Sequence, residues 1–119
     1  MDFMSTRLSP IVGIRTASWA RFTQEIYRGI LHYRRLHQAW QIQTSIDSTH
    51  ELEPITIDRF WKGDGVIVFR PTGAEVRAWQ KRHTAIVSIS SESAPLGLPI
   101  VVPDFEESGR IVARHFVSL

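Results

Sequence analysis

The chain has 119 residues, 43% of them hydrophobic, and its 14 basic and 12 acidic residues leave a net charge of +2. This size and balance predict one folded domain, and they exclude both intrinsic disorder and the concentrated positive charge of a dedicated nucleic-acid-binding unit. The sequence has no cysteine, which excludes a disulfide scaffold, and no apolar run near the roughly 18 residues of a membrane helix, so we expect a cytoplasmic protein.

The first nine residues are polar, and we expect a flexible leader there, followed by a single lobe over residues 10–119. The lobe begins with the apolar run Ile11-Val12-Gly13-Ile14, which is typical of a strand covered on both faces. From Phe22 to Tyr33 the apolar residues recur at three- and four-residue steps, which predicts a helix. Gly29 lies within that helix, and a close approach of the helix to the sheet would explain a glycine there.

The same two periodicities predict four more strands, at residues 39–46, 66–69, 85–89 and 99–102. Residues 54–61 form a short helix or a turn, with Ile55, Ile57 and Phe60 as its apolar contacts.

Two more helices are expected, at residues 73–81 and from Asp104 onward. The first should turn Val76 and Trp79 inward, and the second should place His115 on its buried apolar stripe.

This order of elements predicts an α/β fold, with an open parallel five-stranded sheet and helices on both faces. Right-handed crossovers favour the strand order 2-1-3-4-5, as in flavodoxin-like domains. Ligands of such sheets bind at the carboxyl ends of the strands, next to the point where the strand order reverses. The sequence therefore predicts a crevice there, lined by residues 16–19, 69–70, 90–91 and 103–104.

Four residues of this crevice are candidate ligand contacts, namely Ser18, Trp19, Arg70 and Asp104. Ser18 and Asp104 also suit the N-cap positions of the helices that follow them, and Glu107 would complete a capping box with Asp104. Trp19 either offers a flat apolar face to a sugar or packs on the end of the sheet. Arg70 either donates to an anionic or hydroxylated ligand or is a solvated loop arginine.

Motifs for metal, phosphate and catalytic sites are missing from the sequence. The five histidines are dispersed, no phosphate-binding glycine motif follows the first strand, and no nucleophile, base and orienting group come together. We therefore expect no catalytic residue, no metal ligand and no cofactor. Asp64 lies between two glycines before its strand, at the opposite end of the sheet, and we interpret it as part of a turn.

Three stretches together resemble a known family: IVGIRTASWARFTQEIYRGILHYRR, WKGDGVIVF and PIVVPDFEESGRIVARHF. In this order they are similar to the amino-terminal lobe of periplasmic-binding-protein-like effector domains of the lactose-repressor (LacI/GalR) type, and particularly to xylose-operon (XylR-like) regulators. The resemblance covers residues 10–119. It implies a non-enzymatic lobe of a transcription regulator that binds a sugar effector, a monosaccharide similar to xylose, and it places an effector-contacting aspartate at Asp104.

The resemblance also implies partners. Members of this family join the lobe to a second lobe and to DNA-binding helices, which in xylose-type regulators are an arabinose-regulator-type helix-turn-helix after the second lobe. We therefore expect one half of a two-lobe clamp that reaches DNA only through a part outside this sequence. A homodimer is expected, with Trp40, Ile42, Arg28, His32 and Arg35 as candidate contacts.

The alternative is a stand-alone flavodoxin-like module for signalling or cofactor binding. A phosphoryl receiver would need acidic residues at the outgoing end of the first strand to hold Mg²⁺, where the sequence has Arg15 instead. A flavin carrier would need a phosphate-cradling turn after that strand, and residues 16–18 provide a poor one.

Overall fold

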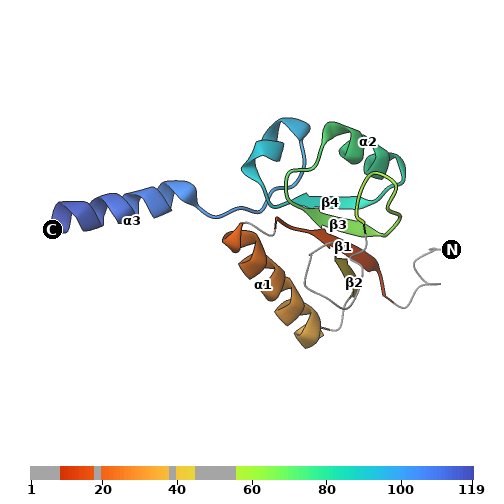
Figure 1. The fold of residues 1–119 in the computed structure, drawn as a ribbon, viewed down its shortest axis with the longest axis horizontal. Helices are drawn as coiled ribbons and strands as arrows, with labels where there is room; N and C mark the ends of the chain where they lie inside the picture. The colour runs from red at the N-terminus through yellow and green to blue at the C-terminus, as the bar shows by residue number, and fades with distance from the viewer. Residues whose placement is uncertain (1–8, 18–19, 38–39, 45–55) are drawn as a thin grey trace.

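A computed structural model gives the fold, and it describes residues 9–17, 20–37, 40–44 and 56–119. Within them, four parallel strands form one sheet in the order β2-β1-β3-β4. The strands are β1 (Ile11–Arg15), β2 (Gln41–Thr44), β3 (Gly65–Val68) and β4 (Ala85–Ser88). The helices are α1 (Arg21–His37), α2 (Gly73–Lys81), the short 3-10 helix η2 (Ser91–Leu96) and α3 (Phe105–Ser118) (Figure 1).

The predicted α/β architecture with a parallel sheet is confirmed, but the fifth strand is not formed. Residues 99–102 contribute one isolated parallel bridge, between Ser88 and Ile100. The expected order 2-1-3-4-5 is therefore not observed, because the sheet of the described residues stops at β4. Pro99 and Pro103 bound this segment, and a proline has no N–H with which to extend a ladder.

Side chains alternate between the two faces of the sheet, and α2 covers one of them. On this face Val66, Val68 and Ile86 pack with Val76 and Trp79 of α2 in the main core cluster. The predicted bounds of α2 and its two inward residues are confirmed. The other face, which carries Val12, Ile67 and Val87, lies on the side of α1 (Figure 1).

The close approach that the sequence analysis assigned to Gly29 occurs at Gly13 instead. A Cβ atom at Gly13 would lie 2.8 Å from the Trp61 ring, whereas one at Gly29 would have no atom within 4 Å. The indole of Trp61 packs over β1, and its Nε1 donates to Gln43 Oε1 of β2 at 2.9 Å. Gly13 thus makes room for a buried tryptophan, and the expectation for Gly29 was wrong.

Two further expectations about burial are wrong. Ile57 is buried, but Phe60 is 64% exposed because residues 59 and 60 form a turn that directs its side chain outward. His115 is exposed, since α3 buries none of its residues and extends away from the sheet (Figure 1). Helical periodicity shows which residues share a face, but it does not show what that face contacts. The predictions for residues 1–8, Ile55 and the ends of the second strand lie outside the described residues.

The contrast between Gly13 and Gly29 gives a matched pair of substitutions. Gly13→Ala forces Trp61 to move and should destabilise the protein by about 1–3 kcal/mol, the usual cost of overpacking. Gly29→Ala adds a methyl group to open space within α1 and should stabilise it by about 0.5–1 kcal/mol. Thermal melting followed by circular dichroism checks both, and equal melting temperatures for the two variants would contradict the packing described.

Candidate functional site

A cavity of about 170 Å³ lies at the carboxyl edge of the sheet, where the strand pattern predicts a crevice. Its walls come from the start of α1, the ends of β3 and β4, η2 and the start of α3. Of the residues expected there, Phe69, Arg70, Ser90 and Ser91 line it, together with Phe22, Ile89, Glu92, Val102 and Phe105. The rings of Phe22 and Phe69 pack edge to face with their centroids 5.7 Å apart, and this contact joins α1 to the end of β3.

Arg70 is held in place from several sides. Its backbone lies in the left-handed region, with φ of 53°, a conformation that is uncommon for a long side chain and typical of positions fixed by their surroundings. Its backbone N–H donates to Ser90 Oγ at 3.1 Å. Its guanidinium lies 3.1 Å from a carboxylate oxygen of Glu92 and 4.9 Å from the centre of the Phe69 ring. Arg70 is therefore a positioned residue of the cavity wall, and its side chain remains 51% exposed.

A buried serine pair supports this wall from behind. Ser88 Oγ donates to Ser90 O at 3.2 Å and accepts from Ser90 N–H at 3.1 Å, and both side chains are buried. These bonds fix the chain where it leaves β4, so that the Ser90 hydroxyl can meet the Arg70 backbone. Sequence reasoning missed Ser88 as a supporting residue, although a serine at the end of a buried strand, two residues before another serine, was the available indication.

Thr16 directly follows β1 at the same edge of the sheet. Its hydroxyl oxygen is buried and has no hydrogen-bond partner within the structure as described. Leaving this buried hydroxyl unpaired costs about 1–3 kcal/mol of stability. Thr16 was expected to line the crevice, but it is not among the residues that line the cavity.

The remaining site predictions have different outcomes. Asp104 is the N-cap of α3, as predicted, and its Oδ1 accepts from the Glu107 N–H at 3.0 Å. The expected capping box is incomplete, because the Glu107 carboxylate forms charge-assisted bonds with Arg110 and Arg114 instead. Asp104 is exposed and does not line the cavity, although the neighbouring residues 102 and 105 do. Ser18 and Trp19 lie outside the described residues.

Arg15, the last residue of β1, is a structural residue. Its Nη2 donates to Glu75 Oε1 at 2.9 Å and its Nη1 to Ile57 O at 2.7 Å. The two side chains are only 23% and 13% exposed. Glu75 also completes a capping box with Thr72 at the start of α2. Arg15 thus fastens the end of β1 to α2, at the position where a phosphoryl receiver would need acidic groups.

The pKa of the Glu75 carboxyl is lowered by this environment. Burial alone raises the pKa, but the hydrogen bond from Arg15, the bond from the Thr72 N–H and the Arg15 charge together outweigh it. The carboxylate is therefore the favoured form in the folded protein.

Other classes of site find no support in the described part of the chain. Its His, Asp and Glu residues form no group of three or more that could hold a metal ion, and none of its helices combines the length and apolar character that crossing a bilayer requires. Comparisons with protein-family models, with curated proteins and with solved structures found no match. What the protein binds must therefore be inferred from its own residues.

The lowered pKa of Glu75 predicts a pH-dependent stability. A carboxyl with a lowered folded-state pKa stabilises the fold above its ordinary value of 4.5, and this stabilisation is lost as the pH falls through the folded-state pKa. Glu75→Gln should lower the free energy of unfolding by about 1–2 kcal/mol at neutral pH. In thermal melts below pH 4.5, the difference in stability between the variant and wild type should shrink.

Glu25→Gln is the matched control, because Glu25 pairs with Arg28 at 2.9 Å on the exposed side of α1. Its cost should stay below about 0.5 kcal/mol at every pH. A difference between Glu75→Gln and wild type that does not change with pH would show that the charge of Glu75 contributes nothing.

Because α3 extends away from the sheet, loss of the Asp104 cap should reduce the helicity of α3 and leave the stability of the core unchanged. Asp104→Ala removes about 1 kcal/mol of capping from a helix that buries no residue, so α3 should lose helicity while the core melts as in wild type. Asp104→Asn keeps a capping oxygen and should retain the helicity. Far-ultraviolet circular dichroism measures both, and a melting temperature lowered as far as in Gly13→Ala would mean that α3 packs on the core in solution.

Proposed function

We propose that the protein is a non-enzymatic effector-binding lobe of a transcription regulator, and that its effector is a monosaccharide of the xylose type. The observation that carries this proposal is the cavity at the carboxyl edge of the sheet. It combines the aromatic rings of Phe22, Phe69 and Phe105 with polar groups from Ser90, Ser91, Arg70 and Glu92.

This set of groups suits the chemistry of a sugar. Each sugar hydroxyl both donates and accepts hydrogen bonds, and the cavity wall offers serine hydroxyls, a donor-only guanidinium and an acceptor-only carboxylate. The C–H faces of a sugar ring are apolar and pack on aromatic side chains such as Phe22 and Phe69.

The cavity is small and open, which supports a role as one half of a two-lobe clamp. In such a clamp a second lobe supplies the remaining contacts, and ligand binding closes the two lobes about a hinge. The finer fold belongs to the same proposal. We propose a periplasmic-binding-protein-like, flavodoxin-like lobe with the strand order 2-1-3-4-5, and the isolated bridge between Ser88 and Ile100 supports a fifth strand beside β4.

Xylose binding to the isolated chain tests the proposal. With half of the contacts missing, we expect a Kd weaker than about 1 mM, detected by saturation-transfer NMR as weak binding that a non-sugar polyol of equal size does not reproduce. Calorimetry that gives millimolar or tighter affinity would contradict the half-clamp. If the polyol control gave the same saturation-transfer signal as xylose, the cavity would not recognise a sugar.

Two threonines near the cavity provide a matched pair for stability. Thr16→Val replaces an unpartnered hydroxyl by a methyl group, so it should keep or raise the melting temperature. Thr23→Val removes a hydroxyl that bonds Ala17 O at 2.9 Å and Ala20 O at 2.7 Å, so it should cost about 1 kcal/mol. Neither residue lines the cavity, so sugar binding should be unchanged in both variants, and equal melting temperatures would contradict the hydrogen bonding described.

A further inference from the structure

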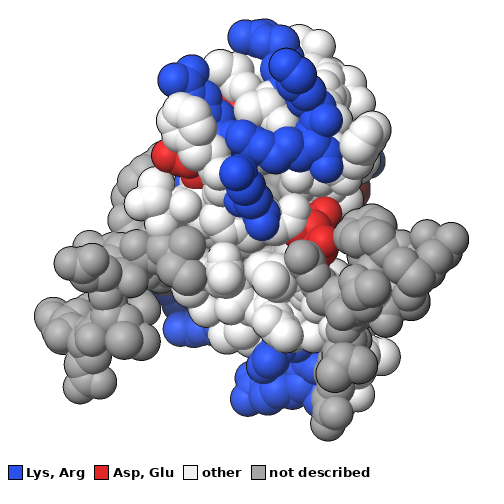
Figure 2. All heavy atoms as spheres, turned by 90° about the vertical axis from the view of Figure 1, so that its right-hand side faces the viewer, with Lys and Arg blue, Asp and Glu red and all other residues white. Residues whose placement is uncertain are grey.

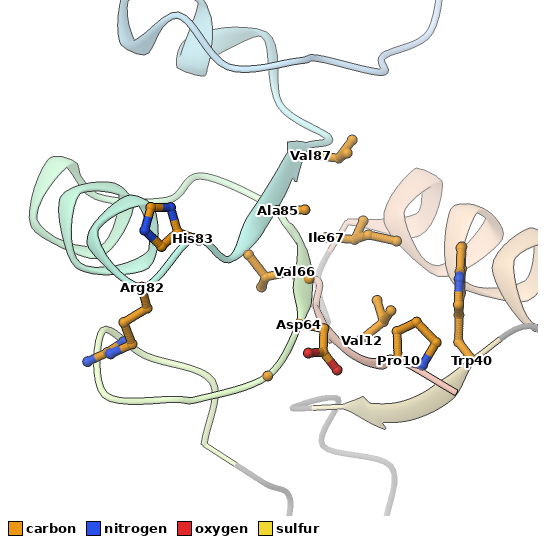
Figure 3. Close-up of a pocket in the computed structure, with 12 residues that line it drawn as sticks. Pro10, Val12, Trp40, Asp64, Val66, Ile67, Arg82, His83, Ala85 and Val87 are labelled. Atoms are coloured by element: carbon orange, nitrogen blue, oxygen red, sulfur yellow. The ribbon is translucent and has the colours of Figure 1, made fainter. Parts of the chain in front are cut away.

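A larger groove, of about 660 Å³, lies at the opposite edge of the sheet, where the strands begin. Its floor is apolar and is built by Pro10, Val12, Ile67, Ala85 and Val87. Trp40 stands at one end of the groove, and Arg82 and His83 lie at the other (Figure 3). The groove therefore has an apolar floor along the sheet and a basic end.

No described helix fills this groove. The face of the sheet that carries Val12, Ile67 and Val87 is the one opposite α2, and α1 reaches the sheet at Trp40, where Arg34 Nε donates to Trp40 O at 2.7 Å. The remaining helix, α3, extends in another direction (Figure 1). A parallel sheet is normally covered on both faces, whereas the described helices leave Ala85 exposed and Ile67 and Val87 half-exposed on this one.

Further basic side chains lie next to Arg82 at the end of α2. Lys81 is exposed at the last position of α2, and Arg59 and Lys62 are exposed in the segment before β3. The guanidinium of Arg82 joins these two segments, since its Nη1 donates to Arg59 O at 2.6 Å and to Trp61 O at 3.3 Å. This cluster of four cations, Arg59, Lys62, Lys81 and Arg82, comes from two segments of the chain, which is why the basic residues look scattered in the sequence.

A second basic group lies at the other side of the groove, where Arg34 and Arg35 end α1 beside Trp40. Figure 2 views this edge of the molecule and shows Lys and Arg side chains gathered above and below a mostly uncharged strip. The ion pairs found among the described residues engage other arginines, at positions 15, 28, 70, 110 and 114. The cations along the groove therefore have no described carboxylate as an ion-pair partner.

Asp64 is the acidic residue that lies in the groove itself. Its Oδ2 accepts from the Ile11 N–H at 2.7 Å, and its backbone N–H donates to Ile11 O at 2.8 Å. The turn interpretation of Asp64 is consistent with these bonds. Its carboxylate is therefore held at the start of β1, where it places one negative charge between the two basic groups.

We propose that this groove binds an acidic amphipathic helix of a partner protein. The apolar stripe of such a helix would lie on the floor of the groove, and its acidic flanks would meet the cations on either side. A nucleic acid would satisfy the cations but would leave the apolar floor unfilled. The helix α3 of a second copy is a poorer match, because Glu106 and Glu107 are already paired with Arg110 and Arg114.

A designed peptide tests this proposal on the full chain. The probe is a fluorescent helical peptide with a leucine stripe and glutamate at its other positions, compared with a scrambled peptide of the same composition and with a DNA oligonucleotide of the same charge. Fluorescence anisotropy should show binding of the amphipathic peptide that weakens as salt is raised, and clearly weaker binding of the other two probes. Equal binding of all three would overturn the proposal, because it would show non-specific attraction of anions.

Variants locate the binding. Lys62→Gln with Lys81→Gln, and separately Ala85→Gln on the exposed floor, should each weaken peptide binding by about fivefold, as expected for losing exposed ion pairs or apolar contact. Arg21→Gln with Arg114→Gln removes the same charge at exposed positions elsewhere and should leave binding unchanged. Equal losses in the two double variants would overturn the proposal. So would light scattering that shows a dimer dissociated by Ala85→Gln, since the groove would then bind a second copy.

Discussion

The ion pair between Arg15 and Glu75 is the interaction on which the arrangement of this molecule depends. It joins the end of β1 to the first turn of α2, and through Ile57 O it also holds the segment that precedes Trp61. Trp61 then packs over Gly13. Among the described residues, one face of the sheet is covered in this way, and a hollow lies at each end of its strands. The carboxyl edge presents a small polar cavity, and the amino edge presents an apolar groove between cations.

The sequence was sufficient where the determinants are local. The bounds of α2 and the burial of Val76 and Trp79 follow from helical periodicity, and the Asp104 cap follows from the chemistry of a short acidic side chain at a helix start. The place of the cavity also follows from sequence, because parallel strands bring their carboxyl ends to one edge. That general rule located Arg70 on the cavity wall without any knowledge of its contacts.

The sequence was insufficient where a property depends on distant segments. Gly29 and Gly13 are both plausible sites of close approach, and only the placement of Trp61 distinguishes them. A short apolar run before Pro103 resembles a strand, but the fifth strand is reduced to one bridge. The apolar stripe of α3 predicts burial, yet the helix buries none of its residues. The basic clusters along the groove could not be predicted from sequence for the same reason, because their members come from separate parts of the chain.

The most direct test of the central claim, that the two edges of the sheet bind different partners, is an amide chemical-shift map of the isotope-labelled protein. Xylose and the acidic amphipathic peptide are added separately and then together. The account predicts that xylose shifts the amides of Phe69, Ser90 and Ser91, that the peptide shifts those of Gly65 and Ala85, and that the two sets do not overlap or compete. A single shared set of shifted amides, or xylose shifts confined to the amino edge, would contradict it.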